Sequence, residues 1–148
     1  MKKGIDYPGV SIVFMCHDGA GNFLLHRRSE QCRDEHGRWD CGGGGLDLGD
    51  AVINTLQKEL EEEFGTNVLD HHFLGYRDVH REHEGVKTHW IALDFLVHVD
   101  REKVVNNEPH KFEELGWFKW GEFPEPRHSQ FPPFFEKHEE KIKELLEI

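Results

Sequence analysis

The sequence predicts a single α+β domain, and three observations lead to this prediction. The chain has 148 residues, enough for one hydrophobic core and too few for two full-sized domains. Hydrophobic residues make up 36% and charged residues 32%, which is typical of a folded globular protein. Apolar runs of strand length are interspersed with segments of helical periodicity, without a repeat or a linker. We therefore expect residues 1–148 to form one domain.

The N-terminal part of the chain predicts a β-hairpin followed by a loop. Residues 10–16 form a β-branched apolar run, residues 18–21 have turn composition, and residues 23–25 begin a second apolar segment. Residues 28–40 are polar and charged, so we expect a loop there.

A helix is predicted for residues 50–64. Apolar side chains recur there on one stripe, and Gly65 follows as a stop signal. The stripe consists of Ile53, Leu56, Leu60 and Phe64. Aspartate is a good N-cap residue, so Asp50 is expected to begin this helix.

The second half of the chain predicts three strands and a C-terminal helix. A charged turn at residues 80–87 separates the first two strands, and a polar loop at residues 100–111 precedes the third. The expected elements are strands at 68–79, 90–99 and 115–120 and an amphipathic helix at 134–148.

The charge balance narrows the range of partners. The chain carries 18 Lys and Arg residues and 29 Asp and Glu residues, a formal net charge of −11. Such a chain repels phosphate backbones and anionic lipids unless its few cations are concentrated, so we expect neither a nucleic-acid polymer nor a membrane as a partner. The acidic surplus either serves solubility or includes carboxylates gathered around a divalent cation.

Apolar stretches and cysteine number indicate the cellular compartment and the redox state of the cysteines. No stretch approaches the roughly 20 apolar residues of a membrane span, and no apolar signal core follows Met1, so we expect a cytoplasmic protein. The three cysteines are odd in number and lack CxxC spacing. This pattern supports neither a disulfide framework nor a cysteine zinc site.

Three carboxylates share one face of the predicted helix. At about 100° per residue, Glu59, Glu62 and Glu63 fall within one arc beside the apolar stripe. Like charges at this spacing destabilise a helix, so they need a cation or good solvation. Mg²⁺ prefers oxygen ligands and commonly binds carboxylates together with substrate phosphates. The alternative interpretation is a solvated acidic face, with Glu61 as one more member.

Consecutive glycines precede this helix. Residues 42–45 are all glycine, and Gly49 follows just before the predicted helix start. A loop of this composition can bring bare main-chain groups up to a metal or a phosphate. It is not an NTPase phosphate loop, since no Gly-Lys-Ser/Thr follows, and it is not the GxGxxG of a dinucleotide fold.

The stretch from Gly44 to Thr66 resembles the signature of the Nudix hydrolases: Gly, five residues, Glu, seven residues, then Arg-Glu-apolar-any-Glu-Glu-any-Gly-apolar. The spacing is matched throughout. Asp50 stands in place of Glu, Lys58 in place of Arg, and Thr66 in place of an apolar residue. Lysine lacks the planar bidentate donor geometry of arginine, so these departures bear on how the catalytic carboxylates are oriented.

The resemblance implies a fold and a reaction. The fold is an α/β/α sandwich with a mixed β-sheet between helices, in agreement with the order of the predicted elements. The reaction is metal-dependent hydrolysis of a phosphoanhydride bond in a nucleoside diphosphate linked to another group, with Mg²⁺ or Mn²⁺ as the cofactor and a small-molecule nucleotide as the substrate.

The resemblance also implies residue roles. The expected metal ligands are Glu59, Glu62, Glu63 and the carbonyl of Gly44. Glu62 or Glu63 is the preferred general base, ahead of Glu114, which lies in a late segment that also resembles the family, and Lys58 would orient the carboxylates. Gly43, Gly44 and Arg28 would contact substrate, although Arg28 can equally be a solvated charge at a strand end.

The twelve histidines invite a second metal hypothesis, especially His71, His72, His80 and His83. No HExxH motif occurs and no cysteine accompanies them at zinc spacing, so we expect scattered surface histidines.

The choice of substrate stays open. We favour a nucleoside triphosphate converted to the monophosphate and pyrophosphate. ADP-ribose or another sugar nucleotide is the runner-up, and a nucleotide-binding module with weakened catalysis is a further alternative. A calcium-binding acidic domain is disfavoured, because residues 47–50 lack the ligand spacing of an EF-hand. A homodimer is compatible with the sequence but not specified by it.

Overall fold

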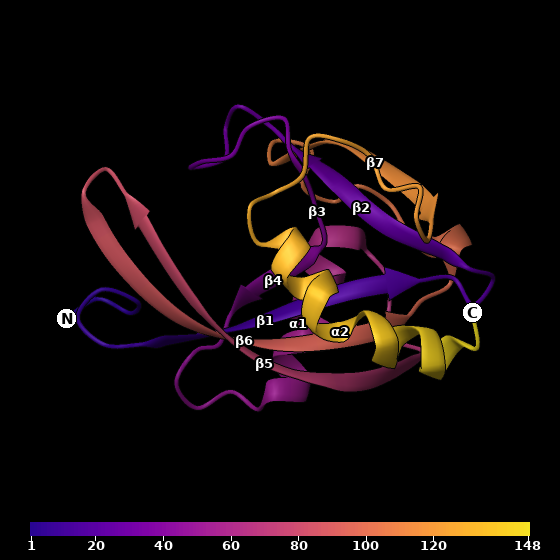
Figure 1. Cartoon of the computed structure of the whole chain (residues 1–148), viewed down its shortest axis with the longest axis horizontal. Helices are drawn as coiled ribbons and strands as arrows, with labels where there is room; N and C mark the ends of the chain where they lie inside the picture. Colours follow the sequence, from indigo (N-terminus) through magenta and orange to yellow (C-terminus); the bar gives the residue numbers. More distant parts are fainter.

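A seven-stranded mixed β-sheet between two helices forms the body of the computed structural model, which describes residues 1–148 (Figure 1). The α+β sandwich predicted from the sequence is therefore confirmed. The elements in chain order are β1 (Gly9–His17), β2 (Asn22–Arg28), β3 (Trp39–Asp40), β4 (Gly42–Gly45), α1 (Val52–Phe64), β5 (Asp70–His83), β6 (Val86–His98), a 3₁₀ turn η1 (Arg101–Lys103), β7 (Phe112–Lys119) and α2 (Phe131–Leu146).

Strand β1 organises the sheet. It pairs in parallel with β6 along its whole length, from Gly9 to His17, whereas every other strand pair is antiparallel. Since β6 occupies one edge of β1, the other edge is shared by β4, which pairs with residues 11–14, and by β2, which pairs with residues 16–17. The sheet is therefore split between β2 and β4.

Alternation along β1 builds a core on each face of the sheet. Ile12, Phe14 and Cys16 point to one side, where they pack with the α1 residues Leu56, Leu60 and Phe64. Met15 points to the other side and packs with the α2 residues Phe131, Phe134 and Ile142. A strand buried on both faces needs apolar residues at successive positions, which explains the continuous apolar run at its centre.

Several element boundaries differ from the sequence-based prediction. The four glycines form strand β4 rather than a loop, because their main chain pairs with β1. The helix begins at Val52 with Ala51 as its N-cap and no side-chain capping bond, so the prediction that Asp50 caps the helix is wrong. Helix α2 begins at Phe131, with Pro132 in its first turn, where a missing N–H costs nothing.

The predicted turn at residues 80–87 is also wrong, since most of it is strand. β5 and β6 continue as a long two-stranded ribbon that projects from the body beside the N-terminus (Figure 1). The turn is confined to Glu84 and Gly85, both with positive φ. Charged residues fit this ribbon because both of its faces lie outside the core.

A buried ionic cluster ties α2 to the sheet. Asp94 of β6 is fully buried and accepts two hydrogen bonds from the guanidinium of Arg77 in β5, at 2.6 and 3.0 Å. His138 of α2 donates to the same carboxylate at 2.7 Å. The paired geometry compensates for the removal of these charges from water.

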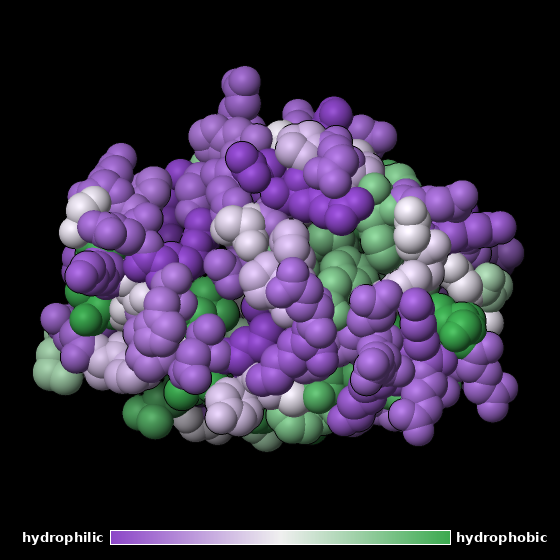
Figure 2. Space-filling model, viewed as in Figure 1, coloured by the Kyte–Doolittle hydropathy of each residue, from purple (hydrophilic) through white to green (hydrophobic).

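The outer surface is largely hydrophilic. Figure 2 shows polar residues over most of one face, with apolar residues in small patches. Neither helix combines the length and the apolar character that a membrane crossing requires.

Replacing Asp94 by asparagine should destabilise the fold strongly. The neutral amide would leave the Arg77 guanidinium buried without a counter-charge, and breaking a buried pair in this way costs about 3–5 kcal/mol. Urea denaturation of Asp94→Asn measures the loss. The control is Glu139→Gln, which removes an exposed ion pair with Lys143 and should change stability far less. Equal losses in the two variants would contradict a structural role for the cluster.

Candidate active site

The carboxylate face of α1 lies directly against the glycine strand β4. A Cβ atom at Gly44 would approach the carboxylate oxygens of Glu59 to 2.5 Å, and one at Gly42 would come within 2.7 Å of Oε2 of Glu63. No other residue type can occupy these positions without displacing the acids. The glycines are thus needed here for their missing side chains, since none of residues 42–45 has a positive φ.

Glu63 is the most buried of the three helix carboxylates, with 7% of its surface exposed. The N–H of Gly43 points at both of its oxygens, at 3.3 and 3.5 Å. Burial raises the pKa of Glu63 well above its usual value, and the nearby Glu59 raises it further. Burial, followed by repulsion from Glu62, also raises the pKa of Glu59, and Lys58 opposes this shift.

This donor set fits a hard divalent cation. The raised pKa values of Glu59 and Glu63 reflect burial together with the repulsion between neighbouring carboxylates. Lys111 lowers the pKa of both acids, and Lys58 also lowers that of Glu59, but the ammonium of Lys111 is already held by Glu108 at 3.0 Å. Carboxylate and main-chain oxygens are the ligands that Mg²⁺ and Mn²⁺ prefer, so Glu59, Glu62, Glu63 and the Gly44 carbonyl are suited to such an ion.

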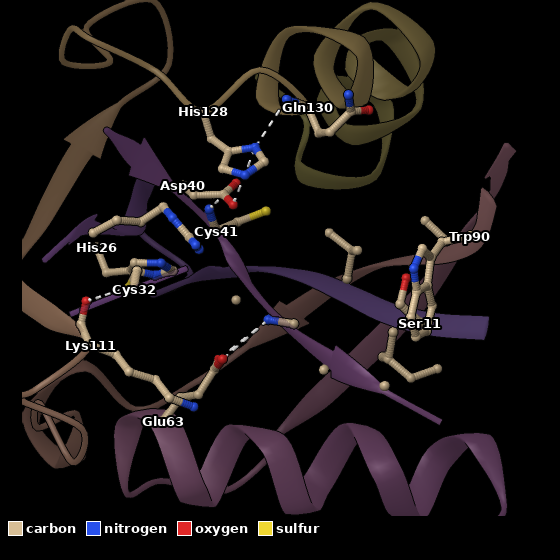
Figure 3. A pocket seen from close by; sticks show the side chains of 18 of the residues that line it. Ser11, His26, Cys32, Asp40, Cys41, Glu63, Trp90, Lys111, His128 and Gln130 are labelled. Carbon is tan, nitrogen blue, oxygen red and sulfur yellow. Dashed lines mark hydrogen bonds and ion pairs between the residues drawn. The ribbon is translucent and has the colours of Figure 1, made fainter. Parts of the chain in front are cut away.

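A cavity of about 570 Å³ opens at the split in the sheet. Glu63 of α1 and Phe134 of α2 both line it, so the cavity reaches both helical layers, and strands β3 and β4 contribute the wall between them. Figure 3 shows Glu63 and Lys111 on the α1 side and His128 and Gln130 on the α2 side.

The lining is cationic although the whole chain is acidic. Five Lys and Arg side chains contribute to it, against the two carboxylates of Asp40 and Glu63. The cations are Arg28, Arg33, Arg77, Arg81 and Lys111. Four of the five are already ion-paired with acids outside the lining: Arg28 and Arg81 with Asp34, Arg77 with Asp94, and Lys111 with Glu108. The lining therefore offers N–H donors for the oxygens of a phosphorylated ligand rather than uncompensated positive charge.

Ion pairs hold the loop between β2 and β3 against this cavity. Arg28 donates to Asp34 at 3.1 Å, and Arg81 of β5 donates to Asp34 and Glu35 at 3.1 and 2.6 Å. Glu35 also lies 2.8 Å from Nε2 of His128. These acids are already neutralised by arginine, so we assign the cluster to positioning the loop rather than to metal binding.

Several buried polar groups at the cavity have no partner in the protein. They are Nη1 of Arg77 and both ring nitrogens of His26. Burial, and secondly the charge of Arg28, lowers the pKa of His26 to about 3, so its ring is neutral and retains one donor and one acceptor. Burial raises the pKa of Asp40, although His128 opposes the shift. The free atoms of His26 and Arg77 can be satisfied by ordered water or by a polar ligand in the cavity.

The structure brings together most of the residues proposed from the sequence. Glu59 and Glu63 meet at β4, Glu62 adjoins them on the same helix, and Gly43, Gly44 and Arg28 line the cavity.

Two of the proposed residues lie apart. Lys58 is exposed on α1 and acts on Glu59 only through its charge. Glu114 does not line the cavity: it is half-exposed and paired with Arg27 at 3.3 Å. The late-segment acid that acts on Glu63 is instead Glu108, which the loop before β7 brings near the helix.

Sequence reasoning did not find the α2-side residues of the cavity. Asp40, Arg77, Arg81 and His128 are scattered over three segments and carry no local spacing pattern. One available signal was the isolated aspartate between Trp39 and Cys41, a polar residue between two apolar ones directly before the glycines.

Comparisons with known proteins agree with this geometry. The NUDIX domain family model matches residues 7–138. The chain is 27% identical over 117 residues to the RNA pyrophosphohydrolase of Acidiphilium cryptum (strain JF-5), an alignment that covers 71% of each chain.

Two solved structures are similar to the whole fold. A MutT NUDIX hydrolase from Burkholderia pseudomallei has a TM-score of 0.78 at 27% identity and covers 89% of this chain and 98% of its own. The MutT protein from Methanosarcina mazei Go1 has a TM-score of 0.74 at 26% identity, covering 94% of this chain and 99% of its own. With the family model spanning most of its length and the signature acids gathered on α1, the chain belongs to the NUDIX domain family and is a Nudix hydrolase.

Proposed function

We propose that the protein hydrolyses a nucleoside triphosphate to the monophosphate and pyrophosphate. The observation that carries this proposal is the continuity of the site: the helix acid Glu63 and five cationic side chains line the same cavity of about 570 Å³. Arginine and lysine N–H donors that suit phosphate oxygens, and a carboxylate that suits a divalent ion, thereby face one ligand.

A divalent ion, Mg²⁺ or Mn²⁺, would be held by Glu59, Glu62, Glu63 and the carbonyl of Gly44. When bound, it would neutralise the phosphate oxygens and lower the pKa of water. The protein's own contribution is to fix these oxygens. The close contact between α1 and β4 places them, and the N–H of Gly43 orients the carboxylate of Glu63.

We assign to Glu63 the role of accepting the proton of the attacking water; its lining of the cavity, which Glu59 and Glu62 do not share, supports this assignment. Glu62 adjoins it and is exposed, so it serves as a ligand and as the second candidate base. Glu114 ranks below both, since its carboxylate faces Arg27 outside the cavity.

In this proposal the Lys and Arg side chains bind the phosphates, and the residues on the α2 side of the cavity bind the nucleoside. Lys111 lines the cavity on the side where Glu63 lies (Figure 3), and Arg28 also lines the cavity. Asp40, His128 and Gln130 offer hydrogen-bonding groups at the opposite end (Figure 3), and Phe134 adds an apolar surface for a base.

Two other substrate classes serve as comparisons for this proposal. ADP-ribose or a sugar nucleotide presents the same pyrophosphate with a different leaving group. A 5′-triphosphorylated RNA is suggested by the name of the Acidiphilium cryptum relative, while the net charge of −11 disfavours a long polyanion. Metal-dependent product release from a panel of all three ranks them. Nucleotide binding without turnover would indicate a module with weakened catalysis.

Removing one helix carboxylate should abolish most of the activity. We expect turnover to require Mg²⁺ or Mn²⁺ and Glu62→Gln or Glu63→Gln to lower kcat by on the order of 10² or more, with the fold retained by circular dichroism. Glu61→Gln is the matched control, because its side chain is exposed on the same helix outside this set. Full activity of folded Glu63→Gln, or in excess chelator, would overturn the assignment.

Lys58 tests the departure from the family signature. If its charge helps to orient Glu59, then Lys58→Ala should lower kcat with little change in stability, because the side chain is exposed. Lys58→Arg should keep or raise kcat, since arginine offers the bidentate geometry. Steady-state kinetics and urea denaturation provide the two readouts. If the alanine variant matched the parent, Lys58 would have no catalytic role.

The position of bond cleavage can be read from isotope incorporation. Hydrolysis of a triphosphate in ¹⁸O-water should give monophosphate and pyrophosphate, with solvent oxygen in only one of the two products as detected by mass spectrometry. ADP-ribose would similarly give AMP and ribose 5-phosphate. Accumulation of nucleoside diphosphate and inorganic phosphate would contradict the proposed positioning and indicate a terminal phosphatase.

A further inference from the structure

The β5–β6 ribbon carries a second group of metal-ligating side chains, outside the main cavity. His80 and His89 are directly opposite each other in the β5–β6 register. Asp78 lies two residues before His80 on the same strand, and residues two apart in a strand share a face. The pairing of the ribbon thus places one carboxylate and two imidazoles on one face.

The three side chains are in contact. The rings of His80 and His89 are stacked, with centroids 4.3 Å apart and planes inclined by 29°. Nε2 of His89 lies 2.9 Å from Oδ1 of Asp78. One potential ligand atom from each residue lies within 4.8 Å of the other two, a separation that one ion can bridge with small side-chain rotations.

The histidine pair also borders a hollow of its own. This hollow, of about 310 Å³, lies between the ribbon and the N-terminal turn and is lined by His80, His89, Lys87, Thr88 and residues 4–8. The main chain of His89 donates to the carbonyl of Gly4 at 2.8 Å, which holds the turn against the ribbon. None of the three ligands lines the main cavity, so this group is separate from the catalytic carboxylates.

Packing in the hydrophobic core does not explain why these three residues are present. Asp78 and His80 are exposed and His89 is partly exposed, so none of them is required by packing. Two stacked imidazoles repel each other when both are protonated, whereas two neutral rings each offer a lone pair. A cation at the nitrogen edges of the two rings, beside the carboxylate, would take one lone pair from each ring and would replace the present contact between Nε2 of His89 and Asp78.

We propose that Asp78, His80 and His89 form a site for a divalent transition metal of the Zn²⁺ class. Imidazole nitrogen suits Zn²⁺, Cu²⁺ and Ni²⁺, whereas the all-oxygen acids of α1 suit Mg²⁺ and Mn²⁺, so the two sites select different ions. Two nitrogens and one oxygen leave a tetrahedral position for water on the side of the hollow. A bound ion cross-links β5 to β6 and thereby stabilises the ribbon.

The proposal is tested on the full chain with Zn²⁺ as the probe. Excess Mg²⁺ occupies the carboxylate site while Zn²⁺ binding is followed by isothermal titration calorimetry, and Co²⁺ substitution reports nitrogen ligation by visible absorption. We expect one saturable equivalent of Zn²⁺. His80→Ala and His89→Ala should each weaken binding on the order of tenfold or more, and Asp78→Asn should weaken it less.

The matched control is His83→Ala, which removes a histidine from the same ribbon that lies outside the cluster and near Glu84. It should leave the affinity unchanged, and the circular dichroism spectra of all variants should match the parent, since these positions are outside the core. Absence of saturable binding, unchanged affinity in the His80→Ala/His89→Ala double variant, or an equal loss in His83→Ala would overturn the proposal.

Discussion

The close approach of helix α1 to strand β4 is the constraint on which the site depends. Two carboxylates can lie against a strand only if that strand has no side chains at those positions, and Gly42 and Gly44 meet this requirement. The same contact removes Glu63 from water and brings it near Glu59, which raises the pKa of both carboxyl groups. The apolar stripe of the helix, buried under β1, holds the acids there despite their mutual repulsion.

The sequence predicted the sandwich and the acids of α1, because both depend on local patterns. Apolar runs located the strands that are buried on both faces, and the spacing from Gly44 to Thr66 located the helix carboxylates. The prediction that Asp50 caps the helix was wrong because a turn precedes the helix. Gly49 has a φ of +94°, and the N–H of Asp50 donates to the carbonyl of Asp47 at 3.1 Å, so the helix begins only at Val52.

The remaining differences come from pairing over long distances. Whether four glycines form a loop or a strand is decided by β1, which lies about thirty residues earlier. The choice between Glu108 and Glu114 depends on the path of the loop before β7, and the meeting of His80 with His89 depends on the register of the ribbon. The sequence indicated scattered surface histidines, whereas the pairing register of β5 with β6 places His80 opposite His89.

The split between β2 and β4 bears on which parts of the cavity wall can vary in sequence. The two strands follow one another along the same edge of β1 and are not paired with each other, and they are linked only through β3, which pairs with β2 at two positions and leads into β4. The connection at residues 29–38 joins β2 to β3 and borders the cavity, while the helix acids are held separately by the contact of α1 with β4. Side chains of a surface loop vary more readily than a packed helix, so this connection is the part of the cavity wall through which ligand preference can diversify while the acids of α1 are preserved.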